Sequence, residues 1–76
     1  MASAKRILYS DHALERLIER GINDKHLEET IRNPDLQVAG RRGKLRALKR
    51  IGSRTLHVVY RELPSMIIVI SAYFDG

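Results

Sequence analysis

The spacing of apolar residues changes at Asn33-Pro34, and this change constrains the fold more than any other feature of the sequence. Before it, apolar residues recur at helical spacing, whereas after it they alternate with polar residues, as in strands. A residue that precedes proline avoids the helical conformation, so a helix should end before this point. Helices followed by strands predict an α+β fold in two layers, with the helices on one face of a mainly antiparallel sheet.

Two short helices are predicted before the proline. The first spans residues 11–20, because Ser10 is a good N-cap and Gly21 supplies a C-terminal stop. The second spans residues 24–32 and follows Asn23, which is also a good N-cap. The residues predicted to face the core are Ala13, Leu14, Leu17 and Ile18 in the first helix and Leu27 and Ile31 in the second.

Turn residues divide the remaining sequence into short segments that are rich in β-branched and aromatic residues. Strands are predicted near residues 36–39, 44–51, 54–61 and 66–74, and residues 5–9 form a β-compatible start. The predicted order is β-α-α-β-β-β, with room for one further strand, in a single domain of residues 1–76. The sheet face opposite the helices would be open to solvent or to a ligand.

Alternation along the predicted strands indicates which side chains share that open side. The residues expected there are Arg46, Arg50, His57, Arg61 and Tyr73. In the last strand, simple alternation places Tyr73 on the same side as Ile67 and Val69. A one-residue register slip or a β-bulge would reverse the assignment of any of these strands.

The positive charge is concentrated in residues 36–61, which we call the basic segment. The chain has 14 cationic residues, nine acidic residues and a formal net charge of +5. Eight of the cations and none of the acids lie in the basic segment, namely Arg41, Arg42, Lys44, Arg46, Lys49, Arg50, Arg54 and Arg61. A concentrated cationic surface is typical of a polyanion binder, because each neutralised phosphate releases counterions. Solubilising charges, or a dock for an acidic protein, would give the same pattern.

The composition and short motifs of the sequence argue against several classes of protein, namely disulfide-rich, metal-binding, cofactor-binding, secreted and membrane proteins. The 76 residues can form one core, and no cysteine is present for disulfides or thiolate metal sites. The three histidines lack the spacing of zinc ligands, and no glycine-rich phosphate loop precedes a helix, so we expect no metal and no cofactor. The start lacks the apolar core of a secretory signal, and the longest apolar run, residues 66–70, is too short to span a bilayer. We therefore expect a cytoplasmic protein without membrane contact.

Residues 12–22 contain the pattern His-Ala-x-x-Arg-x-x-x-Arg-Gly-Ile after an extended segment. This pattern resembles the opening of the small bacterial and archaeal family known as domain of unknown function 4258, and the resemblance covers almost the full chain. It marks His12, Arg16 and Arg20 as family motif positions. The family is similar in architecture to the RelE/ParE-like toxins, many of which are endoribonucleases neutralised by an antitoxin. The resemblance therefore implies a RelE/ParE-like fold.

Metal-free RNA cleavage requires a base, an acid and cations for the charge that develops on the phosphorane. His12 and His57 are the candidate acid and base, because imidazole titrates near neutrality. Arginines could clamp the phosphate, and Tyr73 could stack on a base. Structural interpretations also exist, since Arg16 can pair with Glu19, and both His57 and Tyr73 can be packing residues.

We therefore predict a small basic domain that binds RNA or the ribosome, with metal-independent endoribonuclease activity of the toxin–antitoxin kind as the stronger form of this prediction. The predicted catalytic residues are His12, Arg16, His57 and Tyr73, and the predicted nucleic-acid-binding residues are Arg20, Arg46, Lys49, Arg50 and Arg61. Two alternatives stay open. One is a noncatalytic nucleic-acid or ribosome-binding module, and the other is a protein-interaction domain for an acidic partner such as an antitoxin segment.

Overall fold

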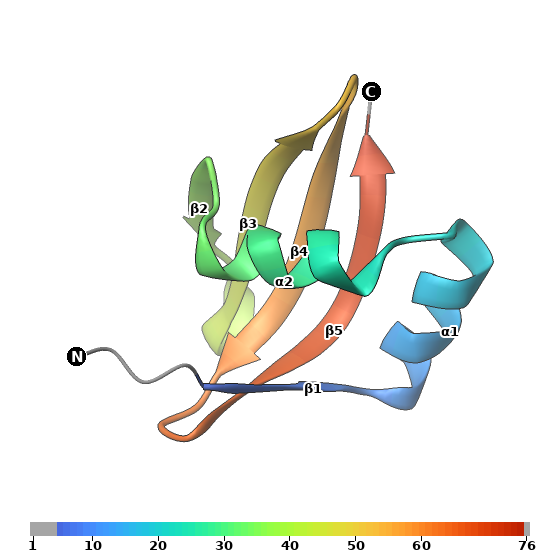
Figure 1. Ribbon diagram of the computed structural model, residues 1–76. Coiled ribbons are helices and arrows are strands. Elements are labelled where there is room, and N and C mark those ends of the chain that lie inside the picture. Colours follow the sequence, from blue (N-terminus) through green and yellow to red (C-terminus); the bar gives the residue numbers. More distant parts are fainter. Residues whose placement is uncertain (1–4, 76) are drawn as a thin grey trace.

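The chain folds into two α-helices and a five-stranded mixed sheet, which is an α+β arrangement (Figure 1). The computed structural model describes residues 5–75. Its elements are β1 (Arg6–Tyr9), α1 (Asp11–Arg20), α2 (Asp24–Arg32), β2 (Leu36–Ala39), the 3-10 turn η1 (Arg41–Gly43), β3 (Lys44–Ile51), β4 (Arg54–Glu62) and β5 (Met66–Asp75). The predicted helices and strands are confirmed almost residue by residue. Four strands follow the helices, so the further strand for which the predicted order β-α-α-β-β-β left room is present.

The strands lie in the order β1-β5-β4-β3-β2 across the sheet. The neighbouring pairs from β2 to β5 are antiparallel and are joined by short turns, as the turn residues predict. The pairing of β1 with β5 is parallel and runs from Arg6↔Met66 to Tyr9↔Val69. The sheet is therefore mixed rather than purely antiparallel, and β1 and β2 form its two edges.

Local capping explains where the helices begin and end. The Ser10 hydroxyl accepts a hydrogen bond from the backbone N–H of Ala13 at 3.1 Å. The Asn23 side chain accepts one from the N–H of Lys25 at 2.8 Å. Gly21 ends α1 in the left-handed conformation, with a φ of 60°, which residues with a side chain rarely adopt. No helix within residues 5–75 has the length and apolar character that a membrane span requires.

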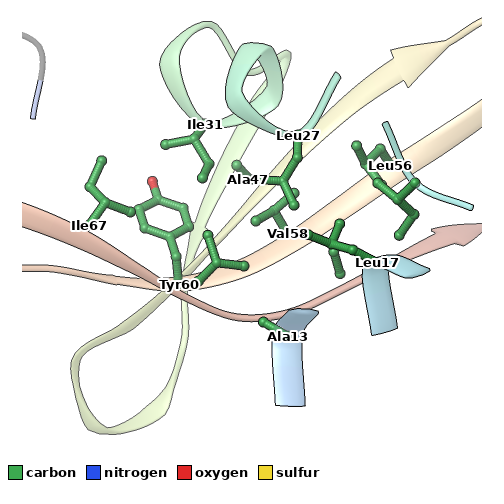
Figure 2. Close-up of a cluster of buried hydrophobic side chains, with 12 residues drawn as sticks. Ala13, Leu17, Leu27, Ile31, Ala47, Leu56, Val58, Tyr60 and Ile67 are labelled. Atoms are coloured by element: carbon green, nitrogen blue, oxygen red, sulfur yellow. The ribbon is translucent and has the colours of Figure 1, made fainter. Parts of the chain in front are cut away.

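The hydrophobic core lies between α2 and the sheet. Figure 1 shows α2 crossing one face of the sheet, and Figure 2 shows Leu27 and Ile31 of this helix pointing toward the strands. Both residues are buried, as predicted. The buried apolar residues are Ala13, Leu17, Ile22, Leu27, Ile31, Ala47, Leu56, Val58, Tyr60, Ile67, Val69 and Ala72. In the part of the chain that the structure describes, no helix covers the opposite face, which we call the open face (Figure 1).

Helix α1 buries a narrower stripe than the sequence predicts. Ala13 and Leu17 are buried, but Leu14 is 44% exposed and Ile18 is 80% exposed. The prediction that all four residues face the core is therefore wrong for Leu14 and Ile18. The reason is that α1 lies beside the edge of β5 rather than flat on the sheet, so only one side of the helix meets the core (Figure 1).

A β-bulge in β5 changes which of its residues face the helices. Tyr60 pairs with Val69, and the pairing with β4 then skips Ile70 before it resumes. Because side chains alternate along a strand, the skipped residue moves the rest of β5 to the other side. Val69 is buried beneath the helices, whereas Tyr73 lies on the open face. The prediction that Tyr73 shares a side with Ile67 and Val69 is wrong for this reason.

Candidate functional site

The open face presents four cations of the basic segment. The strand register places Lys44, Arg46 and Arg50 of β3 on this face together with Arg61 of β4. Their partners in β4 alternate with residues that are buried on the helix side, which fixes the direction of each side chain. The three arginines are exposed, so their guanidinium groups are accessible to a ligand.

Two other cations of the basic segment lie on the helix side of the sheet. The ammonium of Lys49 donates a hydrogen bond to the carbonyl oxygen of Asn33 at 3.0 Å, at the end of α2. The guanidinium of Arg54 lies 4.3 Å from the centre of the Phe74 ring, a cation–π contact. Lys49 and Arg46 were both predicted as nucleic-acid-binding residues. They point to opposite faces of the sheet, so they do not lie beside each other.

Four side chains at the centre of the open face form what we call the His57 cluster, comprising Arg46, His57, Tyr73 and Asp75. His57 and Tyr73 pair directly across β4 and β5, and their rings stack with centroids 4.7 Å apart and an angle of 11° between planes. The guanidinium of Arg46 donates a hydrogen bond to the Tyr73 hydroxyl at 3.2 Å. A carboxylate oxygen of Asp75 lies 3.6 Å from His57 Nε2. The strands thus bring together Arg46, His57 and Tyr73, which were predicted as site residues on separate grounds.

The His57 ring is mostly buried although it lies on the open face. Its side chain is 11% exposed, since Tyr73 covers one face of the ring. The Nδ1 atom is buried and has no hydrogen-bond partner among residues 5–75. The Nε2 atom, beside the exposed carboxylate of Asp75, is therefore the ring nitrogen that is placed to exchange a proton with a ligand.

The motif residues of α1 are not joined to the His57 cluster. The guanidinium of Arg16 donates a hydrogen bond to a carboxylate oxygen of Glu19 at 2.8 Å, which is the structural pairing that the sequence also allowed. The guanidinium of Arg20 donates to the carbonyl oxygen of Ala72 at 2.7 Å, and so fastens α1 to the part of β5 that extends past β1. His12 is exposed, and its side chain makes no hydrogen bond or ion pair with another of the described residues.

Tyr73 has a neighbouring strand on one side alone. Pairing between β1 and β5 stops at Tyr9↔Val69, so within residues 5–75 no strand lies beside Tyr73 on the side away from His57. The Tyr73 side chain is partly exposed. An aromatic ring at such a position can stack on a planar group of a ligand.

Apolar side chains accompany the cations on the open face. Leu8 of β1 is 38% exposed, and Leu36 and Val38 of β2 are 56% and 36% exposed. Their partners in the register place all three on this face. The open face therefore combines exposed apolar surface with cations, which suits a ligand that has both rings and negative charge.

The His57 cluster offers anion binding by arginine, stacking by aromatic rings and proton exchange by imidazole. Within residues 5–75, no group of three or more histidine, aspartate or glutamate side chains is arranged to hold a metal ion. Asp75 was not among the residues predicted from the sequence. The signal was available, because Tyr73 and Asp75 are two residues apart in one strand and so share a side.

Comparison with known proteins gave one family. A family model described as Domain of unknown function (DUF4258) matches residues 9–74. The matched region extends from the end of β1 into β5 and includes the basic segment and Tyr73. Searches of curated proteins and of solved structures found no significant match.

Proposed function

Because the chain belongs to the family described as a domain of unknown function (DUF4258), we propose a function from the geometry of the open face, namely that the domain binds RNA there. The observation that supports this proposal best is the stacked His57–Tyr73 pair, which lies among exposed arginines on a sheet face without a helical cover. Cations bind phosphates and rings stack on bases, so one surface offers both kinds of contact that RNA requires.

The charge distribution favours RNA over a neutral ligand. Guanidinium groups bind phosphate oxygens with paired hydrogen bonds, and Arg46, Arg50 and Arg61 are exposed on the same face. Each phosphate contact releases condensed counterions. Binding of a single strand should therefore weaken with salt, with a log–log slope of about −0.7 for each contact.

The His57–Tyr73 stack favours unpaired RNA over a duplex. Bases in a loop or a single strand can be splayed out and stacked on aromatic side chains, whereas the bases of a helix are already stacked on each other. Each base stacked on an aromatic ring contributes about 1–3 kcal/mol to binding. Tyr73 is partly exposed and, within residues 5–75, meets no strand on one side, so it is the ring best placed for this contact.

Binding of a labelled single-stranded RNA at several salt concentrations tests the proposal. Arg46→Ala/Arg50→Ala removes two cations from the open face, whereas Lys49→Ala/Arg54→Ala removes two cations of the same segment from the helix side. We expect the first variant to bind more weakly and to flatten the log–log slope by roughly 1.4, and the second to bind like the parent. Equal losses in the two variants would show that RNA responds to overall charge and not to the open face.

RNA cleavage is the stronger form of the proposal. This stronger form includes a likeness in architecture to the RelE/ParE-like toxins. In this mechanism His57 Nε2 accepts the proton of the ribose 2′-hydroxyl as that oxygen attacks the phosphorus, and a water molecule protonates the leaving 5′-oxygen. The Asp75 carboxylate, 3.6 Å from the same Nε2, stabilises the imidazolium that forms, and Arg46 stabilises the charge on the phosphorane. Neither His12 nor Arg16 is joined to the His57 cluster. The two residues would therefore take part only if RNA bound on the open face also reaches α1.

Incubation of labelled RNA with the protein in excess chelator tests for cleavage, and the expected product ends in a 2′,3′-cyclic phosphate. His57→Gln should retain RNA binding and cleave about 10²- to 10⁴-fold more slowly, because it removes the proton-exchanging group. His12→Ala and Arg16→Ala should keep the parental melting temperature, since both lie on the surface of α1. Cleavage at the parental rate by both α1 variants would show that α1 is not part of the cleavage site. RNA binding by a parent protein that does not cleave would identify the noncatalytic module.

An acidic protein partner, such as an antitoxin segment, is the second candidate ligand. The observation that favours it is β2, an edge strand whose four residues are all exposed. An extended acidic segment could add a strand to this edge while its carboxylates meet the cations of the open face. A synthetic peptide of alternating glutamate and valine tests this possibility, because strand addition would protect the amides of β2 from hydrogen exchange. Unchanged exchange in β2 would leave RNA as the ligand of the open face.

A further inference from the structure

A pocket of about 190 Å³ lies on the open face where β2 and β3 are joined, and we call it the hairpin pocket. Its lining residues are Val38, Ala39, Gly40, Arg41, Lys44, Leu45, Arg46 and Val59. Pockets for drug-sized ligands measure roughly 300–1,000 Å³. The hairpin pocket is smaller, so its size fits a single ring system or a group of similar volume.

The hairpin pocket is lined by both apolar and cationic side chains. Val38 and Val59 contribute apolar surface from two strands, and the cations are Arg41, Lys44 and Arg46. The lining residues that the structure describes include no carboxylate. Apolar surface favours a ring and the three cations favour a negative charge, so the pocket is complementary to a ligand that contains both.

The pocket is continuous with the His57 cluster through Arg46. This residue lines the pocket, and its guanidinium also donates a hydrogen bond to the Tyr73 hydroxyl at 3.2 Å. Val59 lies two residues from His57 in β4 and therefore on the same face. An RNA strand with one base stacked at Tyr73 would thus have a neighbouring nucleotide near the hairpin pocket.

The wall of the pocket is held by the turn between the strands. The N–H of Gly40 donates a hydrogen bond to the carbonyl oxygen of Lys44 at 2.7 Å, which closes the turn. A Cβ atom at Gly40 would lie 3.2 Å from that same oxygen, so glycine permits this close approach. The pocket is therefore formed before a ligand arrives, which lowers the entropic cost of binding.

We propose that the hairpin pocket binds one nucleotide of single-stranded RNA, with the phosphate on the cations and the base against Val38 and Val59, which lie on either side of Arg46 across β2, β3 and β4. The proposal rests on RNA binding by the open face and names a nucleotide subsite within it. The guanidinium plane of Arg46 can stack on the base, a contact that arginine often makes with unpaired RNA.

Binding of adenosine 5′-monophosphate, followed by NMR of the valine methyl groups, tests the subsite in the intact chain. We expect adenosine 5′-monophosphate to change the chemical shifts of the Val38 and Val59 methyl groups most. Ribose 5-phosphate has the same phosphate but no base, and should bind at least about tenfold more weakly, which corresponds to about 1.4 kcal/mol. Equal affinity for the two compounds, or methyl shifts away from the pocket, would overturn the proposal.

Two substitutions in β2 provide a matched comparison. Val38→Glu places a carboxylate in the pocket, whereas Leu36→Glu adds the same charge to the same face of the same strand outside it. We expect Val38→Glu to weaken binding of adenosine 5′-monophosphate about tenfold or more and Leu36→Glu to change it less than threefold. Arg41→Ala should also weaken binding of adenosine 5′-monophosphate several-fold, and Lys25→Ala on α2 is its control. This second pair tests the subsite even if Val38→Glu does not fold. Equal effects within both pairs would overturn the subsite.

Titration of RNA into the same variants separates the subsite from the general proposal. RNA binding that depends on Arg46 and Arg50 but not on Val38 or Arg41 would overturn the nucleotide subsite and leave the open face as the RNA surface. Failure of the parent protein to bind any single-stranded RNA would overturn RNA binding itself. Parallel losses of RNA and mononucleotide binding in Val38→Glu and Arg41→Ala are the result that we expect.

Discussion

The two faces of the sheet differ in burial, in charge and in what their polar groups contact. Val58 and Val59 are neighbours in β4, yet Val58 is 0% exposed beneath the helices and Val59 is part of the open face. On the helix side, Lys49 and Arg54 contact a backbone carbonyl and an aromatic ring of the domain itself. On the open face, Arg50 and Arg61 are exposed, although the Arg50 guanidinium also donates a hydrogen bond to the carbonyl oxygen of Gly52 at 3.1 Å.

This difference teaches that a basic segment of sequence is not one basic surface. Alternation along β3 and β4 divides its cations between the faces, and on the helix side Lys49 and Arg54 contact groups of the domain itself. Substitutions on the helix side should therefore alter stability, and substitutions on the open face should alter binding. Four predictions test this separation.

The largest effect should come from shortening a leucine on the helix side. Leu56 is 0% exposed, so Leu56→Ala should lower the free energy of unfolding by about 2–5 kcal/mol through lost burial and a residual cavity. The same substitution at Leu36, which is 56% exposed on the open face, should cost less than about 1 kcal/mol. Denaturant unfolding of both variants measures the difference. Similar losses would mean that the two faces contribute equally to stability.

A smaller effect is expected on RNA affinity from Tyr73 on the open face. Tyr73→Ala should weaken binding of a single-stranded RNA by about 1–3 kcal/mol, because a stacking ring is lost. Tyr73→Phe keeps the ring and loses the hydroxyl that accepts the hydrogen bond from Arg46, so it should retain most of the affinity. Fluorescence anisotropy gives both dissociation constants. Equal weakening by the two substitutions would assign the role of Tyr73 to its hydroxyl and not to stacking.

Two arginines of α1 should differ by about 0.5–1 kcal/mol in their effect on the free energy of unfolding. Arg20→Ala removes a charge-assisted hydrogen bond to the backbone of β5 and should lower the free energy of unfolding by about 1 kcal/mol. Arg16→Ala removes an exposed helical pair with Glu19, which is worth at most about 0.5 kcal/mol. Thermal unfolding of the two variants at one salt concentration compares them. A larger loss in Arg16→Ala would show that Arg16 has a structural partner beyond Glu19.

The smallest effect concerns the pH dependence of stability. Burial raises the pKa of the Tyr60 hydroxyl above its usual value of 10.0, and the hydroxyl also accepts a hydrogen bond from Gln37 at 2.6 Å. Since the folded-state pKa is above the unfolded value, the stabilisation is complete below about pH 10 and is lost as pH rises through the folded-state pKa. The parent should therefore lose stability above pH 10 more steeply than Tyr60→Phe. Identical alkaline slopes would contradict this assignment.

Local chemistry explains why the elements could be predicted. The caps at Ser10 and Asn23 and the left-handed Gly21 act over a few residues, so their effect is visible in the sequence. Turn residues similarly marked the ends of the strands. Exposure of Leu14 and Ile18 could not be predicted in the same way, because it depends on where α1 docks against the sheet.

The candidate site was predictable only in part, since it depends on register. Arg46, His57 and Tyr73 were expected on one face, but the bulge at Ile70 is what moves Tyr73 there. Alternation within β5 shows that Asp75 shares a side with Tyr73, but the position of Asp75 beside His57 depends on the pairing of β4 with β5. The roles of these residues in RNA binding or cleavage stay predictions until they are measured.

The most direct measurement of the central claim is NMR of the valine and leucine methyl groups during titration with a single-stranded RNA. Residues on the two faces alternate in sequence, so one spectrum of the intact protein compares both faces under identical conditions. We predict that the methyl shifts of Val59 and Leu48 on the open face change most and that those of Val58 and Leu56 change little. Larger changes at Val58 and Leu56, or no change at Val59 under saturating RNA, would contradict RNA binding by the open face.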